Sequence, residues 1–342
     1  MPDEKPLIVP VFIPHQGCPH RCVFCDQEKI TSQPAGAIHG TRVRELLEQA
    51  RQCRGFYSRK HREIAFYGGT FANLPEKTIR EVLGVVAPFL QEGTFQSVRV
   101  STRPDSLDER KAVLLKELGV GTVELGTQSM DDDVLTKSRR GHTAQDTERA
   151  VILLKRHGFR VGVQLMPGLP GDSAEKFSAT VRQVIRLKPD MVRLYPVVVL
   201  RGTELARWVE RGIYQALALE EAVQICAGSC LCLEEAGIPV IRIGLMASSS
   251  LREKGQIVAG PWHESFGHLV RSEIYQRSIE AFLPKPGQTK GISIRIPGKD
   301  AALLRGHRNE GIRRIEKVTG ARMDAILADD SLPAGGIAVE TK

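Results

Sequence analysis

The sequence predicts an α/β fold built on parallel strands, followed by a small α+β region. From Leu7 to about Ile243, short apolar runs alternate with longer amphipathic segments, and the alternation repeats about six times. Such a pattern indicates strand–helix–strand units with right-handed crossovers. After about Leu283 the pattern changes, and residues 283–291 have the Pro-, Gly- and Lys-rich composition of a linker. The candidate architectures are a full or partial α/β barrel and an open doubly wound sheet.

The individual elements follow from apolar patterning and from helix-ending glycines. The predicted strands are 7–13, 63–68, 97–102, 122–126, 160–166, 191–199 and 239–244, and the predicted helices between them are 78–91, 108–119, 144–158, 173–188 and 219–237. Three of these helices end at Gly119, Gly158 or Gly237, because glycine suits a left-handed C-cap. Beyond the linker we expect a strand at 292–297, helices at 299–304 and 310–321, and strands near 323–328 and 335–340. Functional side chains are expected at the C-terminal ends of the parallel strands.

Composition narrows the class of protein. The chain has 342 residues, 42% hydrophobic and 26% charged, with a net charge of +8 and seven cysteines. This length suggests two domains, or one barrel-sized domain with an appendage. An odd number of cysteines argues against a secreted disulfide framework. Because no run approaches the ~18–20 apolar residues of a membrane span, and the N-terminus does not resemble a secretory signal, we expect a cytoplasmic protein.

Three cysteines follow the first predicted strand in a Cys-x3-Cys-x2-Cys arrangement: Cys18, Cys22 and Cys25. Three thiolates this close together can hold three corners of an iron–sulfur cube, which leaves one iron open to chelate a small molecule. Zinc is the alternative. Its sites usually contain a Cys-x2-Cys pair and need a fourth ligand, which His15 or His20 can supply.

The cysteine motif resembles the signature of the radical S-adenosylmethionine (SAM) superfamily. The resemblance implies a partial (β/α)6 barrel, a 4Fe–4S cluster held by the three cysteines, and SAM bound to the open iron. It further implies that an electron from the cluster cleaves SAM to methionine and a 5′-deoxyadenosyl radical. A reductant such as flavodoxin or ferredoxin would supply that electron.

The resemblance also implies SAM-binding residues at successive strand ends. Gly68, Gly69 and Thr70 stand where the family has a Gly-Gly-Glu-like motif, although a simple strand-to-helix turn is the alternative. Gln128 and Arg140 resemble a pair that contacts SAM in oxygen-independent coproporphyrinogen oxidase, and an arginine fork suits a carboxylate. A charge in a solvated turn is the alternative for Arg140. The predicted SAM contacts are Phe24, Gly68, Gly69, Thr70, Ser101, Gln128, Arg140 and Gln164.

Further segments resemble the radical SAM domain of the Elongator catalytic subunit and its bacterial relatives, which modify the wobble uridine of tRNA. They are 101–105, 139–142, 166–172 and 193–205, and the resemblance covers about residues 7–280. Arg193 and Tyr195, at the end of the sixth predicted strand, are candidates for facing the substrate. The acetyltransferase domain and the long N-terminal tRNA-binding region of that family are not recognised, so acetyl-CoA chemistry is not expected.

The last segment resembles a KH fold, in which a Gly-x-x-Gly loop between two helices clamps a nucleic-acid backbone. Here the loop is 306–309, with asparagine in place of the second glycine. Residues 290–322 contain nine Lys or Arg and three acids, a basic surplus that suits phosphate binding. The predicted RNA contacts are Arg305, Gly306, His307, Arg308, Arg313 and Arg314. A small dimerisation or capping domain is the alternative.

We therefore expect a radical SAM domain over residues 1–285 and a KH-like RNA-binding domain over residues 286–342. The expected function is modification of RNA, with tRNA as the expected substrate and no membrane partner. The alternatives are a radical SAM enzyme acting on a small molecule or protein, and a non-catalytic RNA-binding or metal-storing module. The remaining clustered polar residues are interpreted as packing residues, with metal ligation as the alternative: Cys226, Cys230, Cys232, His263 and His268.

Overall fold

The computed structural model describes residues 6–333 and 335–341, which form two compact units. The first unit contains the residues up to Ala218 together with Leu233–Trp262, and the second contains Leu219–Cys232 and the residues from His263 onward. The second unit therefore includes a long helix that precedes the predicted division at residue 285. No helix among the described residues is long and apolar enough to span a membrane.

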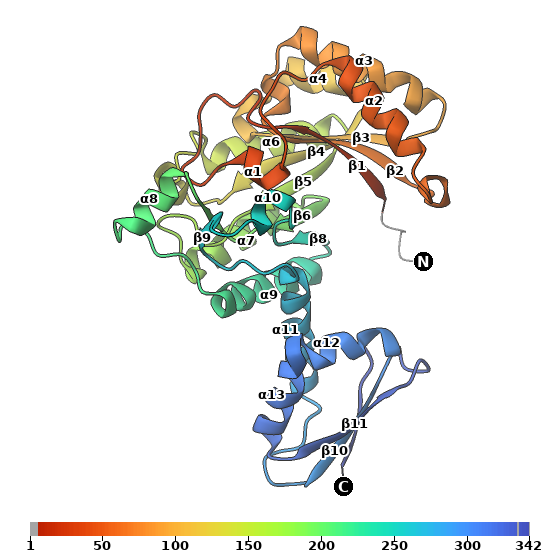
Figure 1. Ribbon diagram of the computed structural model, residues 1–342, viewed down its shortest axis with the longest axis vertical. Coiled ribbons are helices and arrows are strands. Elements are labelled where there is room, and N and C mark those ends of the chain that lie inside the picture. Colours follow the sequence, from red (N-terminus) through yellow and green to blue (C-terminus); the bar gives the residue numbers. More distant parts are fainter. Residues whose placement is uncertain (1–5, 334, 342) are drawn as a thin grey trace. The chain divides into compact units, whose positions relative to one another are not determined.

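The first unit is built on seven parallel strands in the order β1-β2-β3-β4-β5-β6-β8 (Figure 1). The strand order follows the chain without reversal, so the sheet curls into a half-barrel. A doubly wound sheet would instead reverse its order at a switch point. The partial barrel is thus confirmed. Its strands are β1 (Leu7–Ile13), β2 (Arg62–Gly68), β3 (Ser97–Thr102), β4 (Val120–Gln128), β5 (Arg160–Leu165), β6 (Met191–Leu194) and β8 (Val240–Ile243).

Helices connect the strands. They are α1 (Gln27–Thr31), α2 (Gly40–Arg51), α3 (Glu76–Gln91), α4 (Glu109–Glu117), α5 (Asp132–Lys137), α6 (Ala144–Arg156), α7 (Ala174–Leu187), α8 (Glu204–Glu210), α9 (Leu219–Glu235) and α10 (Ser249–Arg252). Of these, α3, α4, α6, α7 and α9 end within two residues of the predicted ends. Gly119, Gly158 and Gly237 follow their helices at φ values of 84°, 68° and 75°, the conformation in which glycine carries no Cβ penalty. At the other end of α6, Thr143 forms a capping box with Asp146.

The predicted strand 191–199 is two strands in the structure. β6 ends at Leu194, and β7 (Val199–Leu200) pairs instead with the antiparallel strand β9 (Ile257–Ala259). Pro196 lies between them and has no N–H to donate to a ladder, so a continuous central strand is excluded. The prediction that residues 191–199 are buried is therefore confirmed, but the prediction that they form one strand is wrong.

The second unit has a mixed sheet in the order β11-β10-β12, in which β10 runs parallel to β11 and antiparallel to β12. Its helices pack on the buried isoleucines of β10 to form a separate core. The elements are α11 (Phe266–Glu280), β10 (Gly291–Ile296), α12 (Ala301–Arg305), α13 (Glu310–Thr319), β11 (Arg322–Ala328) and β12 (Ala338–Thr341). The α+β class of this region is confirmed, while its KH resemblance stays a prediction.

Candidate functional site

One cavity of about 430 Å³ opens in the first unit at the C-terminal ends of the parallel strands. Its wall contains all thirteen residues that the sequence assigns to the cluster, to SAM or to a substrate in the barrel. They are Cys18, Cys22, Phe24, Cys25, Gly68, Gly69, Thr70, Ser101, Gln128, Arg140, Gln164, Arg193 and Tyr195. Residues more than 170 positions apart in the sequence therefore share one site.

The three cysteines lie on the loop between β1 and α1, partly buried and facing this cavity. The Cys18 Sγ lies 3.3 Å from the Thr70 Oγ1, and the Arg140 Nη1 donates to the Cys22 Sγ at 3.0 Å. Burial and the two neighbouring thiols raise the pKa of Cys25, because thiolates so close together repel one another. A cationic group bound among the three would remove that cost, as an iron–sulfur cluster does.

The donor set fits a cluster better than a single zinc ion. Among the described residues, no three His, Cys, Asp or Glu side chains lie close enough together to hold one metal ion. The cube places its irons between its ligands, so its thiolates need not converge on one point. The two candidate histidines also have other partners, since the His15 ring accepts from the Gln27 N–H at 3.0 Å and the His20 Nε2 lies 3.1 Å from the Arg140 carbonyl oxygen.

The two glycines at the end of β2 hold the cysteine loop in place. Gly69 donates to the Ile13 carbonyl at 2.9 Å and Thr70 donates to the Gln16 carbonyl at 2.7 Å. A Cβ on Gly69 would lie only 1.9 Å from the Gln16 carbonyl oxygen. Gly68 has a φ of 107°, which a residue with a side chain rarely adopts. The close approach that requires glycine at position 69 is thus to the backbone of the cysteine loop.

Gly69→Ala is therefore expected to displace the cysteine loop and to lower cluster occupancy after reconstitution. Overpacking of this kind costs about 1–3 kcal/mol in the free energy of unfolding. Gly84→Ala is the matched control, because a Cβ at that α3 position meets nothing within 4 Å. It is expected to keep the cluster and to gain about 0.5–1 kcal/mol from the helix interior. Iron content and urea unfolding of both variants check the expectation, and equal cluster occupancy would contradict it.

Arg140 is a buried group of the site, and its solvated-turn alternative is wrong. Its side chain is 7% exposed, and its Nη2 donates to the Gly126 carbonyl at 2.5 Å in addition to the bond with Cys22. Beside it, the Gln164 Nε2 donates to the Gln128 Oε1 at 3.2 Å. Gln128 stands at a register shift between β4 and β5 with a φ of 68°, which turns its side chain into this group. The irregular end of β4 thus determines how the predicted SAM contact Gln128 is placed relative to its neighbours in the cavity.

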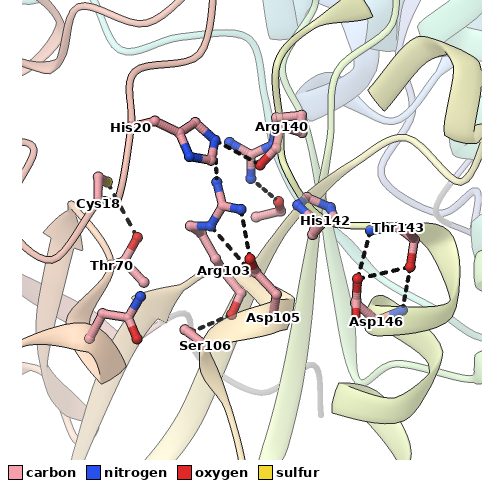
Figure 2. Close-up of polar contacts among 12 residues, drawn as sticks. Cys18, His20, Thr70, Arg103, Asp105, Ser106, Arg140, His142, Thr143 and Asp146 are labelled. Carbon is pink, nitrogen blue, oxygen red and sulfur yellow. Dashed lines mark hydrogen bonds and ion pairs between the residues drawn. The ribbon is translucent and has the colours of Figure 1, made fainter. Parts of the chain in front are cut away.

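Arg103 completes the support of the cysteine loop, and the sequence interpretation missed it. This buried side chain forms a two-pronged ion pair with Asp105 at 2.8–2.9 Å, and its Nη1 lies 3.3 Å from the His20 Nε2. Figure 2 shows His20 facing both Arg103 and Arg140, so that the middle of the cysteine loop is tied to the residue after β3 and to the loop between α5 and α6. The Arg-Pro-Asp run after β3 was the available signal.

His142 lies behind this group and stays neutral. Its Nε2 donates to the Thr127 carbonyl at 3.2 Å, and burial followed by the charges of Arg140 and Arg103 lowers its pKa from 6.5 to about 3. Between those two pH values the unfolded chain binds a proton that the folded chain excludes. The stabilising contribution of neutral His142 to the free energy of unfolding is therefore fully present above pH 6.5 and is lost as the pH falls toward 3.

Urea unfolding of the cofactor-free protein from pH 7.5 to 5 checks this sign. The wild type is expected to lose stability below pH 6.5 by up to about 1.4 kcal/mol per pH unit from this residue. His142→Gln keeps an N–H donor but has no titrating group, so its curve is expected to be flatter. If the free energy of unfolding falls equally with pH in the two proteins, His142 does not cause the loss of stability at acid pH.

The barrel interior also holds a chain of buried charges that periodicity did not reveal. Arg99 bonds to Glu63 at 2.6 Å and also to Glu124, which in turn bonds to Arg193 at 2.9 Å. Tyr67, Glu124 and Arg193 line the cavity, whereas Glu63 and Arg99 do not. Polar residues at inward-facing positions of otherwise apolar strands were the signal.

In the second unit, the loop between α12 and α13 has an unusual backbone. Gly306, Arg308 and Asn309 have φ values of 66°, 50° and 62°. Asparagine tolerates this conformation better than arginine does, so the loop stores strain at Arg308. The rings of His307 and His263 meet edge to face with centroids 4.9 Å apart.

Two of the predicted RNA contacts around this loop, Arg313 and Arg314, already bond to other groups of the protein. The Arg313 Nη1 donates to the Arg308 carbonyl at 2.8 Å and so braces the loop. Arg314 forms ion pairs with Glu273 at 2.7 Å and with Glu280 at 2.5 Å, so its charge is already neutralised. Cys226 and Cys230 are buried in α9, in agreement with their interpretation as packing residues, whereas Cys232 is exposed, so its interpretation as a packing residue is wrong.

Comparisons with known proteins agree with this geometry. A family model described as Radical SAM superfamily matches residues 12–184, and one described as Radical_SAM C-terminal domain matches residues 189–276. The solved structure of Elp3 from the archaeon Methanocaldococcus infernus, with an N-terminal deletion, has a similar fold. Its TM-score is 0.61 at 24% identity, over 80% of this chain and 63% of that chain.

Curated relatives include tRNA uridine(34) acetyltransferases and heme chaperones. A tRNA uridine(34) acetyltransferase of Methanocaldococcus jannaschii is 29% identical over 64% of this chain and 47% of its own length. One of Dehalococcoides mccartyi is 32% identical over 58% and 50%. The heme chaperone HemW of Lactococcus lactis is 28% identical over 61% and 54%. The chain spans about half the length of these relatives.

The first family model covers half of the chain and includes the cysteine loop and every predicted SAM contact. The 4Fe–4S cluster and SAM are the cofactors of that family, and the thiols, Arg140 and the shared cavity fit them. The chain belongs to the radical SAM superfamily and is an enzyme of that class.

Proposed function

We propose that this radical SAM enzyme modifies uridine in tRNA. The observation that carries the proposal is the single cavity whose wall contains the three cysteines, the predicted SAM contacts and the substrate candidates Arg193 and Tyr195. The relatives named tRNA uridine(34) acetyltransferase support RNA as the substrate class. The basic surplus of residues 290–322 supports a phosphate-rich partner.

In this proposal each residue of the cavity has a defined task. Cys18, Cys22 and Cys25 would hold the cluster, which together with SAM would supply the radical chemistry for removing a hydrogen atom from the substrate. Arg140 binds the SAM carboxylate, while the amides of Gln128 and Gln164 bond to ribose hydroxyls. A small reductant such as flavodoxin or ferredoxin delivers the electron.

Apolar and backbone groups complete the pocket. Phe24 and Met166, both 9% exposed, belong to one core cluster and line the cavity, so they keep water from the reacting atoms. Gly68, Gly69 and Thr70 hold the cysteine loop, and Ser101 offers a hydroxyl at the end of β3.

The second unit contacts RNA through the loop 306–309. Arg305 and Arg308 are exposed, so their charges are available to phosphates, and His307 is half-buried between them. Gly306 permits the turn, and Arg313 braces it. The role of Arg314 is to anchor α13 to α11 rather than to meet RNA.

The loop variant His307→Asp/Arg308→Asp tests this contact. RNA affinity is expected to fall and its salt dependence to weaken, since each lost phosphate contact lowers the slope by about 0.9 for duplex or 0.7 for single strands. Lys254→Asn/Lys285→Asp is the control, because it removes the same three charges from exposed positions outside the loop and outside residues 290–322. Titrations at several salt concentrations check both variants. Equal affinities and slopes for wild type and loop variant would leave this unit as an assembly or capping element.

The proposed reaction itself is tested by mass spectrometry of tRNA nucleosides from cells with and without the gene. One modified uridine is expected to disappear when the gene is deleted and to return with the wild-type gene, but not with Cys22→Ala. An unchanged nucleoside profile would contradict tRNA modification. It would then favour the activity class named by the heme chaperone relative.

A further inference from the structure

Two phenols and a carboxylate converge on one guanidinium at the wall of the cavity. The Arg193 Nη2 donates to the Tyr67 hydroxyl at 2.7 Å and to the Glu124 Oε1 at 2.9 Å, and its Nη1 donates to the Tyr195 hydroxyl at 3.2 Å. All four side chains line the cavity that holds the cysteines and the predicted SAM contacts. They come from β2, β4 and the end of β6, so the curvature of the sheet brings them together (Figure 1).

The hydrogen-bonding capacity of this group is only partly used. Tyr67 and Tyr195 each accept a bond from Arg193 and keep their own O–H hydrogens to donate. Burial, followed by the nearby carboxylate of Glu124, raises the pKa of Tyr67, so its proton is retained. The Glu124 Oε1 accepts from both Arg99 and Arg193, while its Oε2 has no bonding partner among the described residues. The group therefore offers two neutral donors and one carboxylate acceptor.

That set is complementary to the edge of a uracil base. Uracil presents an imide, an N3–H donor between two carbonyl acceptors, whereas cytosine presents a bare N3 acceptor beside an amino donor. A carboxylate oxygen bonds to the N3–H of uracil but repels the lone pair of cytosine N3. Proteins read single-stranded RNA through such base edges, and a wrong base is rejected when it leaves a buried group unpaired.

We propose that Glu124, Tyr67 and Tyr195, positioned by Arg193, read the imide edge of a uracil base that enters the cavity. The proposal rests on the proposed function, which supplies a uridine as substrate, and adds the residues that select it. Glu63 and Arg99 belong to the same charge network but do not line the cavity, so they support the barrel and do not read the base.

The test uses the reconstituted holoenzyme with SAM and an RNA hairpin carrying uridine, 3-methyluridine or cytidine at one loop position. The methyl group replaces only the N3–H, so it removes the donor that Glu124 is expected to bond. Wild-type enzyme is expected to bind the uridine hairpin about 10–100-fold more tightly than either analogue. Tyr67→Phe and Tyr195→Phe are each expected to weaken uridine binding about 2- to 10-fold. Tyr57→Phe, at an exposed position outside the cavity, is the matched control.

Glu124→Gln gives the sharpest outcome. Arg99 and Arg193 both donate to the Oε1 position, so they hold the amide oxygen of the glutamine there. The amide NH2 then stands where the Oε2 stood and donates to a base. Preference is therefore expected to move from uridine toward cytidine, whose N3 accepts. Glu63→Gln alters the same network away from the cavity and is expected to keep the wild-type preference.

The outcomes separate this proposal from the proposed function. If the hairpins neither bind nor stimulate SAM cleavage by wild-type enzyme, both proposals fall. If RNA binds and stimulates cleavage but uridine and 3-methyluridine bind equally, the base-reading role alone is overturned. The same holds if Glu124→Gln and Glu63→Gln show the same ratio of uridine to cytidine affinity. A shift toward cytidine in Glu124→Gln only would support the assignment.

Discussion

Replacing Cys18, Cys22 and Cys25 together by alanine is expected to abolish both the brown colour of the anaerobically reconstituted protein and its cleavage of SAM. The three thiols face one cavity, and Arg140 and Thr70 already contact two of them. Without thiolates the cluster has no protein ligands left on that loop. Iron and sulfide analysis, visible absorbance and 5′-deoxyadenosine formation measure the effect.

Exposed cysteines provide the control for this variant. Cys53 and Cys232 are exposed, and neither lines the cavity. The double variant Cys53→Ala/Cys232→Ala is expected to take up the cluster and cleave SAM as the wild type does. A full cluster in the triple variant would show that the cluster is held elsewhere and would remove the cysteine loop from the site.

Arg140→Ala is expected to weaken SAM binding about 10- to 150-fold. A lost charge-assisted hydrogen bond is worth about 1.5–3 kcal/mol, and Arg140 is only 7% exposed, so bulk water screens its charge little. Its partners on the protein side, the Cys22 thiol and the Gly126 carbonyl, fix the guanidinium beside the cysteine loop. Equilibrium binding of SAM to the reconstituted variant measures the loss.

The neighbouring arginine separates binding from general charge effects. Arg139 is exposed and does not line the cavity. Arg139→Ala removes the same charge and is expected to leave SAM affinity within about twofold of wild type, because an exposed charge is screened by water and salt. Unchanged SAM affinity in a folded, cluster-loaded Arg140→Ala protein would remove Arg140 from the SAM site.

The fold could be predicted closely because each buried strand is a short apolar run bounded by helix and turn signals. β1 and β3 occupy the predicted ranges 7–13 and 97–102. The exception, 191–199, was mispredicted because apolarity does not distinguish a strand from a buried turn around proline. Hydrophobic periodicity alone likewise does not predict the order of the strands in the sheet. The observed pairing of neighbouring strands shows that the sheet is a half-barrel.

The sequence predicted the part of the site whose residues lie together in one short motif. Cys18, Cys22 and Cys25 form such a motif. The sequence did not identify Tyr67 and Glu124 as candidate base-recognition residues. Their proposed role depends on Arg193, which contacts them only in the folded, curled sheet. A single sequence does not show contacts between side chains more than sixty residues apart, so a polar residue in a strand could equally be a satisfied strand-end group.

The most direct test of the central claim is SAM cleavage by the reconstituted protein under reducing, anaerobic conditions, measured with and without tRNA. The expected result is formation of 5′-deoxyadenosine by the wild type, stimulated by tRNA that contains an unmodified uridine, and none by the triple cysteine variant. If cluster-loaded protein binds SAM but forms no 5′-deoxyadenosine in either condition, the assignment of radical chemistry to this cavity is contradicted.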